Sequence, residues 1–206
     1  KTYLRSIKLK TAFVISVQIA ILVIIFGLWE ILVSSNVIDG FIYSSPSRMI
    51  ATLGTLMKSG ELITHALITL KETLLAFFIA TGLGFVIAVL LWSNNTLKRI
   101  LEPYIVVLNS LPKIALGPLI IIWFGAGTKA IVVMGFLIVI IVTIINILNA
   151  FLNTDKNTIL ALESMGANKW QIFTKIVLPS SFPDIISTLK INVGLAWIGA
   201  IMGEYL

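Results

Sequence analysis

Long apolar runs alternate with short polar connectors along the 206-residue chain. A helix rises about 1.5 Å per residue, so about 20 apolar residues cross a bilayer core that is about 30 Å thick. The pattern predicts five membrane-spanning helices, at residues 11–33, 63–92, 101–124, 130–151 and 185–206. We therefore expect an all-α polytopic membrane protein, organised as one transmembrane domain over residues 1–206.

The fourth and fifth runs are separated by a connector, residues 152–184, that is too polar to lie in lipid. Asp155 and Asn168 each precede a short helical pattern, and both residue types are common helix N-caps. Gly166 is suited to end the first of these helices, and Gln171 completes a capping box with Asn168. We expect two capped helices that face water.

Prolines and glycines predict further helix boundaries. Pro179 should end the second short helix, and Ser181 should cap the fifth span behind it. In the connector 34–62, Pro46 begins an amphipathic pattern that Gly60 closes. This pattern predicts a short helix lying on the membrane surface.

Composition agrees with a protein embedded in a lipid bilayer. Only 12% of the residues are charged and the mean hydropathy is +1.06, whereas about 25% of the residues in a soluble domain are charged. The formal charge of +6 is distributed between the spans and forms no single patch. We therefore expect no nucleic-acid partner.

The basic residues predict the orientation of the chain in the membrane. Most of them precede the first run, follow the second run, or lie in the connector 152–184: Lys1, Arg5, Lys8, Lys10, Lys98, Arg99, Lys156, Lys169 and Lys175. Fewer lie in the other connectors: Arg48, Lys58 and Lys129. The positive-inside rule then predicts a cytoplasmic N-terminus and a cytoplasmic connector 152–184.

The third span carries polar residues and helix-breaking prolines. Glu102, Asn109 and Lys113 recur on one side of it, and Pro112 and Pro118 each remove a backbone donor. A lysine at mid-span costs about 2.5–3.5 kcal/mol unless it faces protein or water. Two interpretations stay open: a broken helix that lines a solute path, or a lysine paired with a carboxylate in a bundle that the prolines shape.

The fourth span carries a polar stripe: Thr143, Asn146, Asn149 and Asn153. The stripe lines a passage or supplies hydrogen bonds between helices, which are worth about 0.6 kcal/mol each. Small residues at helical spacing predict packing faces on the second and fifth spans: Ala76, Ala80, Gly84 and Ala88, then Ala196, Gly199, Ala200 and Gly203. The candidate translocation-path residues are Asn109, Lys113, Asn146, Asn149 and Glu204.

Enzymatic chemistry is not indicated. The chain has no cysteine and one histidine, His65, and we find no nucleophile with a base, no metal-ligand spacing and no phosphate-binding loop. If ATP drives transport, another chain must hydrolyse it.

The connector 152–184 resembles the EAA loop of binding-protein-dependent ABC importer permeases. That loop has the pattern E-A-A-x-x-x-G, nine further residues and I-x-L-P, and here Gly166 precedes residues 176–179 (IVLP) at that spacing. Other segments are similar to the nitrate, sulfonate and taurine branch of the family: residues 43–47 (YSSPS), 111–119 (LPKIALGPL), 122–125 (IWFG) and 194–197 (GLAW).

The resemblance implies the type I ABC importer transmembrane fold, with a sixth span after the five found here. It also implies a plasma-membrane location, a second permease copy in a homodimer, an extracytoplasmic solute-binding protein, and ABC ATPase subunits that use ATP and Mg. The solute would be a sulfonate, nitrate, taurine or a vitamin precursor. ATPase coupling would fall to these residues: Leu160, Ala161, Leu162, Glu163, Gly166, Ala167, Trp170, Leu178 and Pro179.

One position departs from the family pattern. Leu160 stands where the family has a glutamate, and Glu163 follows three residues later. Residues three apart on a helix lie on nearly the same face. Either Glu163 replaces the usual carboxylate, or the loop docks by apolar contact.

Two other functions are compatible with a polytopic chain. An ion-driven secondary transporter would need carboxylates within its spans, whereas we expect Glu30, Glu72 and Glu204 near span ends. A membrane scaffold without transport is the other alternative, and loss of solute uptake in an inserted Gly166→Pro variant would argue against it.

Overall fold

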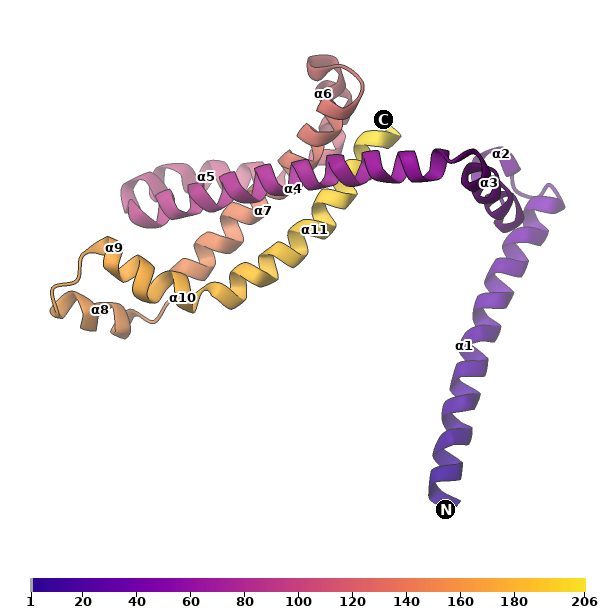
Figure 1. Ribbon diagram of the computed structural model, residues 1–206, viewed down its shortest axis with the longest axis horizontal. Helices are drawn as coiled ribbons and strands as arrows, with labels where there is room; N and C mark the ends of the chain where they lie inside the picture. The colour runs from indigo at the N-terminus through magenta and orange to yellow at the C-terminus, as the bar shows by residue number, and fades with distance from the viewer. Residues whose placement is uncertain (1) are drawn as a thin grey trace. The chain divides into compact units, whose positions relative to one another are not determined.

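A computed structural model describes residues 2–206, with side chains from Lys10 onward. The side chains of Arg5 and Lys8 and the whole of Lys1, which contribute to the predicted orientation, lie outside the described residues. The described chain folds into helices joined by short connections (Figure 1). It forms two compact units, residues 1–66 and 67–206.

The first unit contains a long helix and two short ones: α1 (Thr2–Ser34), α2 (Gly40–Tyr43) and α3 (Pro46–Ser59). Ser45 caps α3 by accepting a hydrogen bond from the Arg48 backbone N–H, and Gly60 ends the helix with a φ of +76°. Both predicted boundaries of this helix are confirmed. The Glu30 carboxylate joins α1 to α3, because it accepts hydrogen bonds from the backbone N–H (3.0 Å) and hydroxyl (2.7 Å) of Ser47.

The remaining elements are α4 (Glu61–Ser93), α5 (Asn95–Ser110), η1 (Lys113–Leu116), α6 (Gly117–Phe124), α7 (Thr128–Leu152), α8 (Lys156–Ser164), α9 (Lys169–Ile172), η2 (Phe173–Val177), α10 (Leu178–Ser180) and α11 (Phe182–Tyr205). Among the described residues, four segments are long and apolar enough to cross a membrane: Lys10–Ser34, Glu61–Ser93, Thr128–Leu152 and Phe182–Tyr205. The pair Asn95–Ser110 and Lys113–Phe124, bent by 83°, forms a fifth candidate. The all-α class is confirmed.

The helices α7 and α11 pack side by side, with α8, α9 and α10 at one end of the pair (Figure 1). A methyl group placed on Gly199 would lie 2.5 Å from the Gly135 Cα, and one on Gly203 would lie 2.9 Å from the Ile131 Cα. Such close backbone contact is how helices associate in lipid. The predicted packing face on the fifth span is confirmed.

The small residues of α4 also form a packing face. Ala76, Ala80, Gly84 and Ala88 are all buried. A methyl group on Gly84 would lie 2.7 Å from the Thr143 Cβ, and one on Gly135 would lie 2.8 Å from the Ala76 Cβ. The same spacing that predicted this face therefore brings α4 against α7.

A buried hydrogen-bond cluster joins α4, α7 and α11. The Asn192 side-chain amide donates to the hydroxyls of Thr81 (3.1 Å) and Thr143 (2.8 Å), and Thr143 in turn donates to the Val139 carbonyl (2.8 Å). Thr143, the first residue of the predicted polar stripe, thus supplies hydrogen bonds between helices. The three asparagines of the stripe line an open groove between α7 and α11.

The third predicted span is interrupted, as its prolines indicated. Helix α5 ends at Ser110, and Pro118 lies in the first turn of α6. The Lys113 ammonium donates to the Asn109 carbonyl at 3.0 Å, which is the acceptor that the backbone N–H of residue 113 would use in an unbroken helix. Lys113 therefore contacts a backbone carbonyl, and not the carboxylate that one of the two interpretations expected.

Glu72 lies about three turns inside helix α4, which begins at Glu61. Its side chain is 1% exposed, and its Oε2 atom has no hydrogen-bond partner. The adjacent Thr73 hydroxyl is also buried without a partner.

Candidate functional site

The connector between α7 and α11 begins with a helix whose first turn is fixed by Asp155. The Asp155 carboxylate accepts hydrogen bonds from the Thr158 hydroxyl (2.6 Å) and from the backbone N–H groups of Thr158 (3.0 Å) and Asn157 (3.1 Å). These bonds stabilise the charged form, so they hold the pKa of Asp155 below its ordinary value. The predicted cap is confirmed.

Helix α8 ends in a Schellman motif. The Ala167 N–H donates to the Leu162 carbonyl (3.0 Å), and the Gly166 N–H donates to the Glu163 carbonyl (2.9 Å). Gly166 has a φ of +84°, in the left-handed region that a residue without a side chain adopts most easily. Gly166 therefore ends the helix, as predicted.

Helix α9 begins with the predicted capping box. The Gln171 backbone N–H donates to the Asn168 side chain (2.9 Å), and the Asn168 backbone N–H donates to the Gln171 side chain (2.8 Å). The chain thus leaves α8 and enters α9 with its backbone donors and acceptors satisfied locally.

Two predicted boundaries after α9 are wrong. Pro179 does not end the helix, because the wider π-turn η2 precedes it and the chain stays helical through α10. Its ring would otherwise press against the carbonyl four residues earlier. Ser181 makes no capping bond, because its hydroxyl donates instead to the carbonyls of Val177 (2.7 Å) and Ala150 (3.0 Å).

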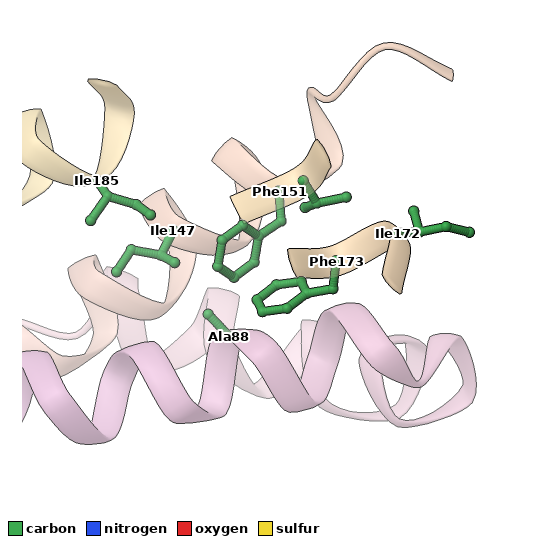
Figure 2. Close-up of a cluster of buried hydrophobic side chains, with 7 residues drawn as sticks. Ala88, Ile147, Phe151, Ile172, Phe173 and Ile185 are labelled. Atoms are coloured by element: carbon green, nitrogen blue, oxygen red, sulfur yellow. The ribbon is translucent and has the colours of Figure 1, made fainter. Parts of the chain in front are cut away.

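One side of this segment is buried against α4 and α7. The core consists of Ala88, Ile147, Phe151, Ile172, Phe173, Val177 and Ile185, and Figure 2 shows the Phe151 and Phe173 rings next to each other near Ala88. The ring centroids of Phe151 and Phe173 are 5.3 Å apart, and those of Phe173 and Trp92 are 5.0 Å apart. The segment is therefore anchored to α4, α7 and the start of α11.

The other side of the segment exposes large apolar side chains. Leu160 is 58%, Met165 82% and Trp170 67% exposed. Of the predicted coupling residues, those exposed are Leu160, Ala161, Glu163, Gly166, Trp170 and Pro179, and those partly buried are Leu162, Ala167 and Leu178. A shallow pocket at the α8–α9 junction is lined by Leu162, Met165, Gly166, Ala167, Gln171 and Lys175.

The predicted path residues do not converge on one site. Asn146 and Asn149 line an open groove between α7 and α11, together with Asn153, Asp184, Ser187 and Thr188. Lys113 lies in a separate apolar depression with Leu108, Leu111, Leu116, Leu137 and Ile141. Asn109 is exposed, and Glu204 accepts a hydrogen bond from the Thr69 hydroxyl near the C-terminal end of α11.

Sequence reasoning missed two kinds of residue at this site. The aromatic contact of Trp92 with Phe173 joins residues far apart in the chain, and no local pattern in the sequence indicates it. Asp184 lies beside Asn149 and Asn153 in the groove, and no local pattern in the sequence indicates that position.

Residues 80–206 match a protein-family model described as "Binding-protein-dependent transport system inner membrane component". The chain belongs to this family. The permease therefore has the type I ABC importer transmembrane fold that the EAA-like loop implied, and it is a multi-pass membrane protein. It is a transport subunit of a binding-protein-dependent system, and not an enzyme.

Individual relatives cover most of the permease. It is 31% identical over 180 residues to a formylaminopyrimidine transport permease protein of Halalkalibacterium halodurans (87% of this chain, 71% of the relative). It is 25% identical over 181 residues to a putative aliphatic sulfonates transport permease protein of Bacillus subtilis (88% and 66%). It is 24% identical over 195 residues to a taurine transport system permease protein of Escherichia coli (92% and 71%). The chain thus spans between 66% and 71% of the length of these relatives.

Proposed function

We propose that the permease forms the translocation path of an ATP-driven importer and is coupled to separate ABC ATPase subunits through residues 152–184. The observation that carries this proposal is a capped, polar segment that is anchored to α4 and α7 on one side and exposes apolar side chains on the other. Exposed apolar groups on an otherwise polar segment mark a protein contact. ATP and Mg belong to the partner in this proposal.

The rest of the assembly follows from the same mechanism. A second copy of the permease completes the path as a homodimer, and an extracytoplasmic binding protein delivers the solute. The N-terminus and residues 152–184 lie on the cytoplasmic side of the plasma membrane, where ATP is available. Closure of the ATPases then moves the segment and switches the spans between inward-facing and outward-facing arrangements.

A direct test is ATP-dependent uptake with the wild-type permease and Gly166→Pro. Proline cannot adopt the positive φ of Gly166, so the variant should insert into the membrane but lose both ATPase co-purification and uptake. Gly82→Ala is a matched control, because no atom lies within 4 Å of the added methyl group. Uptake that survives ATP depletion while the ion gradients persist would refute the proposal and favour a secondary transporter.

We further propose that docking relies on apolar contact through Leu160 and Trp170, and that Glu163 does not replace the usual glutamate. Leu160 and Trp170 each expose more than half of their surface. Leu160→Asp should abolish ATPase co-purification, whereas Glu163→Ala should retain it and keep ATP-driven uptake. The opposite pair of results would assign the docking to the Glu163 carboxylate.

The solute that the surroundings of Lys113 favour is a small organic anion, such as the sulfonate or taurine that relatives are named for. The Lys113 ammonium donates to one carbonyl and has three donors in all, and its other neighbours in the depression are apolar. Lys113→Met should reduce uptake of an alkanesulfonate more than tenfold and leave ATPase co-purification intact. Uptake of nitrate or a vitamin precursor, and not of the alkanesulfonate, would show that the solute is not a small organic anion of this kind.

A further inference from the structure

Phe173 is a buried residue within the segment 152–184, and its ring contacts several other aromatic rings. It is 3% exposed, and its ring centroid lies 5.0 Å from Trp92, 5.3 Å from Phe151 and 5.6 Å from Trp170. Aromatic pairs at such distances contribute attraction beyond the area they bury. Phe173 thus touches three aromatic rings from three different elements.

These three rings connect different parts of the permease. Trp170 belongs to α9 and is 67% exposed on the side proposed to meet the ATPase. Phe151 lies at the end of α7, and Trp92 lies at the end of α4. The chain itself joins residues 152–184 to α7 and α11, but it does not join them to α4. The Trp92–Phe173 contact is a non-covalent link to that helix.

The π-turn η2 begins at Phe173, and the Leu178 N–H donates to the Phe173 carbonyl five residues earlier. One extra residue in a turn rotates the preceding helix by about 100° relative to the following one. The rotation orients α9 and Phe173 together relative to α10. Phe173 faces the core (Figure 2), and Trp170, one turn earlier, stays exposed.

We propose that Phe173 is a positioning residue that transmits displacement of residues 152–184 to α4 through its contact with the Trp92 ring. This inference rests on the proposed coupling to an ATPase. Ile172 is equally buried, at 3% exposed, in the same cluster, but it has no aromatic ring with which to meet Trp92. If the role of Phe173 were purely structural, substitutions at Ile172 and at Phe173 should have similar effects on transport. If Phe173 transmits displacement, only its substitution should uncouple ATP hydrolysis from import.

The test uses the full transporter in proteoliposomes, with permease, ATPase and binding protein, and measures solute molecules imported per ATP hydrolysed. Phe173→Leu keeps an apolar side chain but removes the ring. We expect it to retain ATPase co-purification and ATP hydrolysis while the import ratio falls about fivefold or more, as for loss of a typical coupling interaction. Ile172→Val, the matched control, should leave the ratio unchanged.

Trp92 variants complete a double-mutant cycle. Trp92→Leu should lower the ratio as Phe173→Leu does, and the double variant should lower it no further. Trp92→Phe, which keeps a ring, should retain most of the wild-type ratio.

An unchanged ratio in Phe173→Leu, or additive losses in the double variant, would overturn the inference. So would a loss that parallels a lower thermal midpoint and weaker assembly, because that pattern marks a structural role. A wild-type permease that binds no ATPase would instead overturn the proposed function on which the inference rests.

Discussion

Asn192 is the residue through which three membrane helices are joined by hydrogen bonds. Its amide donates to Thr81 and Thr143, and its own side-chain oxygen is buried without a partner. Hydrogen bonds between helices in a membrane contribute about 0.6 kcal/mol on average and about 1.7 kcal/mol at most. The cluster therefore specifies which faces meet more than it raises the overall stability.

Thr143→Val removes one of these bonds without changing the shape of the side chain much. We expect the free energy of unfolding in detergent micelles to fall by about 0.6–1.7 kcal/mol, measured by thermal or denaturant-induced unfolding. Thr55→Val in α3 is the control, because its hydroxyl donates only to the Ala51 carbonyl within its own helix. Equal losses in both variants would show that the contact between helices contributes nothing.

Asp155 makes the folding stability of residues 152–184 depend on pH. Hydrogen bonds from Thr158 and Asn157 hold the pKa of the folded carboxyl below that of the unfolded chain. The stabilisation is therefore fully present above about pH 4, near the unfolded pKa, and is lost as the pH falls through the folded pKa. The difference in thermal midpoint between wild type and Asp155→Asn should be constant at neutral pH and shrink in acid; a difference that grows in acid would contradict the assignment.

At this scale, residues whose role depends on their immediate neighbours were predictable. The caps at Asp155 and Asn168 and the glycine stop at Gly166 follow from side chains within a few residues. Pro179 and Ser181 were misjudged because their partners are set by tertiary structure: a π-turn accommodates the proline, and the serine hydroxyl reaches Ala150 on α7.

At the scale of elements, the α7–α11 pair is held by contact between glycine backbones. Gly199→Ala would place a methyl group 2.5 Å from the Gly135 Cα, so the helices would have to separate. Overpacking of this kind costs about 1–3 kcal/mol. We expect a correspondingly lower unfolding midpoint, whereas Gly194→Ala on the same helix, with no atom within 4 Å of the added methyl group, should have little effect. Comparable midpoints for the two variants would rule out the tight contact.

The sequence predicted the spans, the packing faces of small residues and the break at Pro112, because each of these is a pattern within one segment. The 83° bend between the two halves of the broken pair was not, since a proline fixes where a helix stops but not where the next one points. The approach of Trp92 to Phe173 could not be predicted either, because it depends on how α4 packs against distant elements.

For the whole molecule, the positive-inside rule predicts which ends of the spans face the cytoplasm. The chain has no cysteine, so a single introduced thiol reports on one position without background. Ser59 and Ser164 are both exposed, in the predicted outer connector and in residues 152–184. On intact cells, an impermeant maleimide should label Ser59→Cys and should label Ser164→Cys only after the membrane is opened. The reverse pattern would invert the orientation.

The helix ends within residues 152–184 are closed by the segment's own atoms: an aspartate cap, a Schellman motif and a capping box. The segment is consequently ordered before any partner arrives, so association does not have to freeze a flexible loop. Binding that avoids such an entropy loss reaches a given affinity with a smaller contact area. A partner can therefore bind residues 152–184 through the few apolar side chains that the segment exposes.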